Sequence, residues 1–418
     1  MRWPFGLGIL DDQPVFLSRW TLSLEHPTVT LFIHTADWQI GKAFARVQDP
    51  AKRTLLQEAR FRAIGRLGQL VREQAAEFVV VAGDLFESAT VPRATVSKAL
   101  ADIGKLSVPV FAIPGNHDHG GTGGLWSQDY FVREQAELAP NLTLLLDFEP
   151  LLLDDAVLLP CPLLRRHDSH DPTAWLQRQD LDWQAFGDRP RIVLAHGSVH
   201  GFTTETEADE DELEGGAMNR INLARLPEGE IDYIALGDWH GTKAVGERAW
   251  YSGALEQDRF ARGSDYSAGN ALVVQVNRGG APTVITHRTG SANWHDVQAR
   301  FNTDADLDGL IGAMKDTIGN RVDEDLVQMT LSGSLGFAAR DQLDQRLDVW
   351  RNRLLRLKLR DDTTIAPTEA EVEALTERSA DPLIAKVASA LQAERLAADA
   401  EAADIARLAL RELYRLAH

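Results

Sequence analysis

The 418-residue sequence is poor in cysteine and has no long apolar run. Cys161 is the only cysteine, which excludes a disulfide within the chain and a zinc site built on several thiolates, and favours a reducing compartment. No stretch approaches the roughly 20 apolar residues that span a bilayer. The opening segment has acids and proline where a signal peptide has its apolar core. We therefore expect a cytoplasmic protein that is not bound to a membrane.

Basic residues are scarce relative to acids. The chain has 43 lysines and arginines against 62 aspartates and glutamates, a formal net charge of -19. This balance argues against non-specific attraction to nucleic acid, because phosphate backbones are usually met with lysine and arginine. A metal-dependent nuclease, however, brings its own cations to the phosphate. The acidic run ETEADEDELEGG at 205–216 predicts a solvated loop.

Short runs rich in valine, isoleucine and leucine recur in the first part of the chain. They are TVTLFIH, EFVVVAG, VPVFAIPG, RIVLAHG, IDYIALG, NALVVQV and PTVITHR. Apolar residues with helical spacing lie between the first and second runs, at 56–71, and between the second and third, at 93–106. Strands that alternate with helices and lack an in-out pattern favour a sheet covered on both faces. We predict one α/β domain at 29–291, preceded by an extension at 1–28.

The pattern changes after residue 291. Residues 292–362 have the order helix, strand, helix, strand, which predicts a small α+β domain. Residues 363–418 begin like a linker and become rich in alanine, leucine, glutamate and arginine, which predicts helices. Near the end, apolar residues fall on one side of a helix: Ile405, Ala409, Leu413 and Leu416. We expect this side to pack on the body of the protein or on a partner helix.

The predicted strands end in residues of one chemical kind. Their exits carry Asp37-Trp38-Gln39, Gly83-Asp84, Gly115-Asn116-His117-Asp118, His196-Gly197 and Gly237-Asp238-Trp239-His240. One such exit alone would be an ordinary turn. Because an open α/β sheet binds ligands at the carboxyl ends of its strands, these loops should meet in one cleft. Oxygen and imidazole donors without thiolates suit manganese, iron, zinc or magnesium, and Asp84 is the candidate to bridge two ions.

These motifs resemble the pattern of the calcineurin-like metallophosphoesterases, which is D-x-H, G-D, G-N-H-D/E, H and G-H-x-H. The corresponding segments here are ADWQIG, AGDLFE, PGNHDH, LAHGSVHG and LGDWHG. Within that superfamily the sequence is most similar to the SbcD branch of double-strand-break repair nucleases, through GDLFES, LPCPLLRR and LPEGEIDYIALGDWHG followed by YSGALEQDRF. The resemblance implies a four-layer α/β/β/α sandwich at 29–291, a small α+β capping domain at 292–362 and a helical C-terminal tail that binds a partner.

The resemblance also implies roles for individual residues. Two divalent ions, Mn²⁺ or alternatively Mg²⁺, would be held by Asp37, Gln39, Asp84, Asn116, His196, Asp238 and His240. His117 would stabilise the pentacoordinate phosphorus or protonate the leaving oxygen, and Asp118 would tune it. Candidates for substrate contact, through base stacking or phosphate binding, are Trp38, Trp239, Arg165 and Arg166.

Two positions depart from the family pattern. Gln39 stands where the first motif has histidine, and Asp238 where the last motif has its first histidine. If both bind, two imidazole nitrogens have become oxygens, and the site favours Mn²⁺ or Mg²⁺ over softer ions. The alternative is a weakened or lost metal.

Three functions follow as hypotheses. The first is a metal-dependent DNA nuclease that works with an SMC-like ATPase docked on the C-terminal helices; the resemblance adds an expected homodimer. The second is a phosphatase or cyclic-nucleotide phosphodiesterase, favoured by the acidic composition. The third is a DNA-end-binding scaffold with an impaired metal site.

Overall fold

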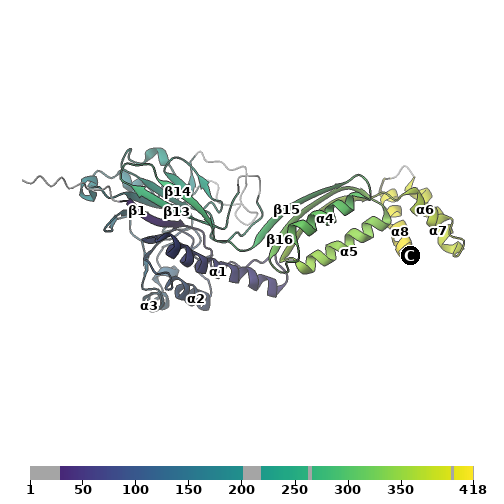
Figure 1. The fold of residues 1–418 in the computed structure, drawn as a ribbon, viewed down its shortest axis with the longest axis horizontal. Coiled ribbons are helices and arrows are strands. Elements are labelled where there is room, and N and C mark those ends of the chain that lie inside the picture. The colour runs from purple at the N-terminus through teal and green to yellow at the C-terminus, as the bar shows by residue number, and fades with distance from the viewer. Residues whose placement is uncertain (1–28, 201–217, 262–265, 397–399, 418) are drawn as a thin grey trace, which may run out of the picture.

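The computed structural model describes residues 29–200, 218–261, 266–396 and 400–417. The predicted extension at 1–28 and the acidic run at 205–216 lie outside these residues. The described chain is elongated: an α/β part, a three-stranded part and a helical end follow one another along the long axis (Figure 1). No helix in the described ranges is long and apolar enough to cross a membrane.

Two six-stranded sheets form the α/β part. The first has the order β14-β13-β1-β2-β3-β4, with β1 (Val29–Thr35), β2 (Phe78–Ala82), β3 (Val110–Ile113), β4 (Leu142–Leu144), β13 (Asn270–Asn277) and β14 (Thr283–Arg288). The second has the order β11-β12-β10-β7-β6-β5, with β5 (Leu151–Leu152), β6 (Val157–Cys161), β7 (Arg191–His196), β10 (Tyr233–Gly237), β11 (Lys243–Ala244) and β12 (Ala249–Tyr251). Strands β1 to β4 are parallel, as are β6, β7, β10 and β12. All of the apolar runs predicted as strands lie in these sheets.

The layers follow from burial on both sheet faces. On β2, Val79 and Val81 face the helices α1 (Pro50–Gln74), α2 (Arg93–Ile103) and α3 (Asp129–Leu138), whereas Val80 faces the second sheet. Between the sheets, Phe32 stacks on Phe78 with ring centroids 5.1 Å apart. Short 3₁₀ helices cover the outer face of the second sheet: η2 (Ala174–Gln177) and η3 (Trp183–Phe186). The predicted α/β/β/α sandwich is therefore confirmed.

The helix α1 links the sandwich to the rest of the chain. Asp49 caps its N-terminus by accepting hydrogen bonds from backbone N–H groups of the first turn. From that turn, the Nζ atom of Lys52 donates to the carbonyl oxygens of Arg351, Asn352 and Leu354, at 3.0, 3.0 and 2.6 Å. These carbonyls end the helix α5 (Phe337–Arg353), where a lysine is favourable because the helix dipole is negative.

The three-stranded part has its own core. Strands β15 (Asn293–Phe301), β16 (Asp325–Leu335) and β17 (Arg356–Ile365) are parallel, with α4 (Asp306–Ile318) and α5 as crossovers. The helices and the last two strands match the prediction, but β15 was missed. Its inward residues are Val297, Ala299 and Phe301, which alternate with polar residues, so the segment lacks the unbroken apolar run by which the other strands were predicted.

Three helices complete the chain: α6 (Glu369–Thr376), α7 (Pro382–Arg395) and α8 (Ala400–Ala417). The helical tail is therefore confirmed. The expected packing face is wrong in part, because Ile405 and Leu416 are 60% and 83% exposed. Leu413 packs as expected, together with Leu410 and Tyr414 of α8, in a cluster that includes residues of α5, α6 and α7. The buried face is thus rotated, and a second apolar face remains on the surface.

Candidate metal centre

The strand-exit loops converge as their order predicted. The loops after β1 and β2 run side by side, since the Asp37 amide donates to the Gly83 carbonyl at 3.1 Å and the Gln39 amide to the Asp84 carbonyl at 2.9 Å. The end of β7 pairs with the end of β10, and the Gly197 amide donates to the Gly237 carbonyl. Exits from both sheets therefore meet at one edge of the sandwich.

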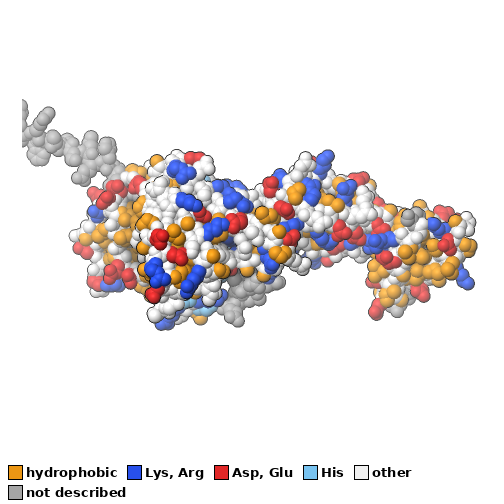
Figure 2. Space-filling view, turned by 90° about the horizontal axis from the view of Figure 1, so that it is seen from below, with side chains coloured by type: hydrophobic (Ala, Val, Ile, Leu, Met, Phe, Trp, Pro, Cys, Tyr) orange, Lys and Arg blue, Asp and Glu red, His pale blue; other side chains and the backbone are white. Residues whose placement is uncertain are grey.

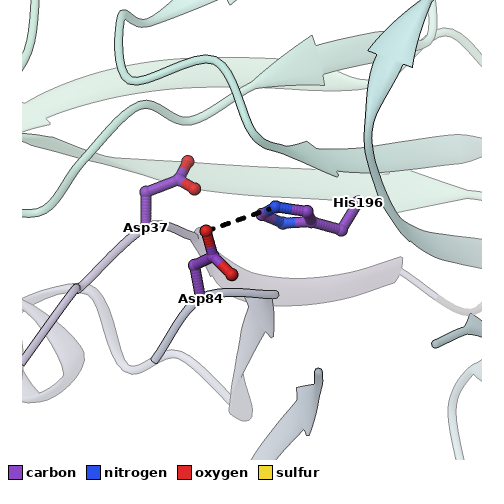
Figure 3. Close-up of side chains that lie close together, drawn as sticks. All are labelled: Asp37, Asp84 and His196. Carbon is purple, nitrogen blue, oxygen red and sulfur yellow. Dashed lines mark ion pairs between the residues drawn. The ribbon is translucent and has the colours of Figure 1, made fainter. Parts of the chain in front are cut away.

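Asp37, Asp84 and His196 form the centre of this edge (Figure 3). Their ligand atoms lie within 4.8 Å of one another, and all three residues are buried. The His196 Nε2 atom is 3.4 Å from the Asp84 Oδ2 atom, the contact drawn as a dashed line. Residues far apart in sequence thus present two carboxylates and one imidazole to a common space.

His196 is oriented by a backbone group. Its Nδ1 atom lies 2.8 Å from the Ala82 carbonyl oxygen, which can only accept a hydrogen bond. Nδ1 therefore carries the hydrogen, and the lone pair of Nε2 is available to bind a metal ion. That Nε2 atom also lies 2.9 Å from the Asn116 Oδ1 atom and 3.8 Å from the Asp238 Oδ1 atom. Asn116 and Asp238 therefore complete a set of donors around the same space.

The loops hold strained backbone conformations at this site. Asp37, Gln39, Asp84 and Asp238 have φ angles of 52°, 42°, 54° and 103°, in the left-handed region that most side chains avoid. Each such residue costs on the order of 1–3 kcal/mol, and such strain concentrates at functional sites. Gly83 is required for a different reason: a Cβ atom there would lie 2.1 Å from the His196 Nδ1 atom.

The site holds more negative charge than its own imidazole can balance. Burial raises the pKa of Asp37 well above its usual range. The neighbouring Asp84 and Asp238 raise this pKa further, whereas His196 lowers it. Burial alone would raise the pKa of Asp84 as well, but His196 and His117 outweigh it and lower the pKa to about 2. Burial would lower the pKa of His196, yet Asp84 raises it well above the ordinary value. Three carboxylates around one imidazole fit a bound cation, since buried charge is costly unless it is compensated.

His117 lies beside this set. Its backbone N–H donates to Asp84 Oδ1 at 2.9 Å, its Nδ1 atom lies 2.9 Å from the Glu87 carbonyl oxygen, and its Nε2 atom is 4.0 Å from Asp84 Oδ2. Asp118 has a different task from the expected one. Its carboxylate accepts from the backbone N–H groups of Gly115 and Phe86, at 2.8 and 3.0 Å, and so fixes the loop. Burial and Asp84 raise the pKa of Asp118 to about 7.

Gln39 and His240 adjoin the site but face a second group of residues. The Gln39 Nε2 atom lies 3.1 Å from the His240 Nε2 atom, and the His240 Nδ1 atom lies 2.9 Å from the Asp258 Oδ2 atom. The Lys42 ammonium contacts both Gln39 and Asp258. The sequence argument assigned no role to Lys42 or Asp258. The available signal was the YSGALEQDRF segment, which contains Asp258.

The four predicted substrate contacts differ in exposure. Trp38 is 1% exposed and donates to the Thr35 hydroxyl, so it packs beneath the site and has no face for a nucleobase. Trp239 is half-buried against Tyr266. Arg165 and Arg166 are exposed after β6. Two bonds of Asn219 hold their loop near His196: its side chain donates to the Arg166 carbonyl, and its carbonyl accepts from the Ser198 amide.

Residues 30–242 match the family model of the calcineurin-like phosphoesterases. The match spans half of the chain and contains every strand-exit loop described above. The chain belongs to the calcineurin-like phosphoesterase family. A solved structure is also similar to this chain, with 14% sequence identity and a TM-score of 0.37. The match covers 63% of this chain and all of the solved chain, and it is too distant to add to the argument. Family membership and the Asp37–Asp84–His196 cluster identify a metal-dependent phosphoester hydrolase.

Proposed function

We propose that this phosphoesterase is an SbcD-type nuclease that hydrolyses phosphodiester bonds of DNA. One observation carries the proposal: beyond the family match, the chain continues into the β15–β17 part and a helical end with an exposed apolar face. A phosphatase for small substrates has no need of either. The branch-specific segment YSGALEQDRF supports the same conclusion, because its Asp258 contacts the family residue His240.

The proposed ion is Mn²⁺, with Mg²⁺ as the alternative, because carboxylate and amide oxygens outnumber imidazole in the donor set. It would be held by Asp37, Asp84, Asn116, His196 and Asp238. When bound, such an ion lowers the pKa of water and offsets charge on the phosphate. The resemblance implies a second ion that shares Asp37 and Asp84 and is also held by His240 and Gln39.

The chain's own residues would divide the remaining work. The Glu87 carbonyl accepts from His117 Nδ1 and so directs Nε2 toward the carboxylate cluster, where an imidazolium with both nitrogens protonated would give the Nε2 proton to the leaving oxygen. Asp118 keeps the loop that carries His117 closed. Arg165 and Arg166 lie exposed on the tethered loop and are placed to contact phosphates that flank the cleaved bond.

Polymer and small-substrate assays test this function. Purified protein with Mn²⁺ is incubated with linear duplex DNA, single-stranded DNA and bis-p-nitrophenyl phosphate. Cleavage of DNA is expected. Cleavage of the small ester alone would favour the phosphodiesterase, to which the net charge of -19 is better suited. No cleavage of any substrate would leave the DNA-end-binding scaffold.

The proposed partner is an SMC-like ATPase bound to the C-terminal helices. Apolar side chains gather at that end of the molecule (Figure 2). The exposed ones include Leu383 and Leu396 around α7 and Ile405, Leu408 and Leu416 on α8. A helix or coiled-coil segment is suited to such a face, because apolar residues at helical spacing pack in the same way.

A charge placed on this face tests the partner. Leu408→Asp with Leu416→Asp should abolish co-purification with an SMC-like ATPase expressed together with this chain, while the melting temperature stays unchanged. Leu152→Asp, at a similarly exposed leucine on the edge strand β5, is the matched control. Retained binding by the double variant would place the partner elsewhere.

A further inference from the structure

The ligands expected for two ions have opposite surroundings. Asp37, Asp84 and His196 face one another, and each offers an atom to the same space. His240 is not part of that cluster within the described residues. It faces Gln39. The two residues lie beside the cationic side chains of Lys42 and Arg259 and not beside unpaired carboxylates.

Lys42 forms a hydrogen bond with the side-chain amide oxygen of Gln39. Its Nζ atom donates to Gln39 Oε1 at 2.8 Å, which fixes the orientation of the amide, because an ammonium has no acceptor. The Nε2 amide group is therefore the one turned toward His240. A metal ion at this position would have to displace the ammonium to reach the only donor that Gln39 offers.

The Nε2 atom of His240, the nitrogen that could bind a metal ion, also has a hydrogen-bond partner. The Asp258 carboxylate lies 2.9 Å from His240 Nδ1, and a guanidinium nitrogen of Arg259 lies 2.8 Å from the same atom. Because the Gln39 amide group that faces Nε2 is a donor, Nε2 carries the lone pair and Nδ1 carries the hydrogen, whose hydrogen bond Asp258 accepts. The Gln39 amide, 3.1 Å away, donates to that lone pair. Neither residue thus keeps an uncommitted donor atom for a cation.

Charge opposes an ion at the same place. Asp258 is fully buried, and Lys42 Nζ, Arg259 Nε and Arg60 Nη2 lie 3.0, 3.3 and 3.9 Å from its carboxylate oxygens. Asp258 therefore lies against three cationic side chains and His240, and Lys42 has a second, longer ion pair with Glu87, at 3.7 Å. A divalent ion beside this group would add repulsion that the Asp37–Asp84–His196 side does not have.

We propose that this chain binds one divalent ion, at Asp37, Asp84, Asn116, His196 and Asp238, and that Lys42 takes the place of the second by holding Gln39 and Asp258, the two partners of His240. Gln39, which replaces the family histidine, is then matched by Lys42, which follows it by three residues in the same loop. The ion count is independent of the substrate, so it can be tested whether or not DNA is cleaved.

Metal stoichiometry decides the count. Full-length protein is equilibrated with Mn²⁺, freed of excess ion, and measured by elemental analysis and electron paramagnetic resonance. We expect one Mn²⁺ per chain and a spectrum without exchange coupling. Two ions per chain, or a coupled spectrum, would overturn the inference and leave the proposed nuclease standing. No bound ion would overturn both.

Variants then test Lys42 itself. Gln39→His alone should still bind one ion, because the ammonium remains; histidine also tolerates the positive φ of this position. Gln39→His with Lys42→Met should bind two ions and show coupling. Gln39→His with Lys98→Met, which removes an exposed lysine of α2, is the matched control and should bind one. A single ion in a folded Lys42→Met double variant would remove Lys42 from the explanation. If that variant does not fold, the count in the unaltered chain still decides.

Discussion

The Nδ1 atom of His196 lies 2.8 Å from the carbonyl oxygen of Ala82, a residue of the other sheet. The contact sets the protonated nitrogen of the imidazole and joins the two sheets at the metal centre. It also depends on the next residue, Gly83, because a methyl group there would collide with the ring.

Gly83→Ala should therefore weaken ion binding. Alanine would suffer twice, from a φ of 93° and from the collision with His196, at an added cost of about 1–3 kcal/mol for the overpacking. Gly123→Ala is the control, since Gly123 has a φ of 80° with open space around it. Mn²⁺ titration calorimetry should show reduced affinity for Gly83→Ala only. Equal affinities would mean that His196 is not a ligand or can move aside.

Bound metal should stabilise the fold through Asp84. At an ion concentration 100 times Kd, stabilisation is about 2.7 kcal/mol, and a chelator should reverse it. Asp84→Asn removes a central carboxylate, so its melting temperature should no longer respond to Mn²⁺. Asp180→Asn, at an exposed position, should respond like the unaltered chain. A persisting shift in Asp84→Asn would place the ion elsewhere.

His117→Ala should lower turnover while sparing the ion. The side chain contributes a proton-transfer group, whose loss typically costs about 10²-fold or more in rate. Its bound Mn²⁺ should be unchanged by elemental analysis. His170→Ala, at a histidine whose side chain is 89% exposed, controls for general effects. Full activity of His117→Ala would remove His117 from the mechanism.

Asp238→His should shift ion preference toward softer metals. It exchanges a hard carboxylate oxygen for the imidazole that the family pattern has at this position, and nitrogen donors suit Zn²⁺ and Co²⁺ better. Competition of Zn²⁺ against Mn²⁺ measures the shift, with Asp238→Asn as the control that keeps oxygen. An unchanged preference would show that residue 238 does not touch the ion.

His34 should make stability depend on pH. It is fully buried, with Nδ1 bonded to the Tyr233 hydroxyl and Nε2 to the Leu236 carbonyl, and burial lowers its pKa to about 3. The unfolded chain takes up a proton near pH 6.5 and the native one does not, so stability falls below pH 6.5, by about 2 kcal/mol at pH 5.

His34→Gln should remove this share of the pH dependence. The measurement is the change in urea midpoint between pH 7 and pH 5, which should be smaller in the variant; His170→Gln, at an exposed position, should behave like the unaltered chain. Identical changes in all three proteins would show that His34 is protonated in the folded state.

Much of the fold could be predicted because burial leaves a local trace. Strand β2 is buried on both faces, so its sequence is one unbroken apolar run, and the exits after it and its neighbours carry the ligands. Strand β15 was missed because only one of its faces is apolar, so polar residues interrupt its apolar sequence at every second position. The packing face of α8 was misplaced because periodicity cannot distinguish a face that covers the core from one that stays exposed.

The contacts around Gln39 were beyond the sequence for a different reason. The motif shows which residues approach the metal, but not which way an amide turns. That is decided by Lys42 and by Asp258, which lies more than 200 residues further along the chain. Long-range hydrogen bonds of this kind leave no periodic pattern in the sequence.

The hydrogen bonds from Lys52 to the last carbonyl groups of α5 have a mechanical consequence. The α/β sandwich and α8 lie at opposite ends of the long axis (Figure 1). Because Arg411 of α8 pairs with Asp341 of α5, a load applied to α8 would reach α5, whose last carbonyl groups are bonded to Lys52 of α1. The helix α1 begins only eleven residues after Gln39, so this contact would pass movement of α5 on to the first ligand loop.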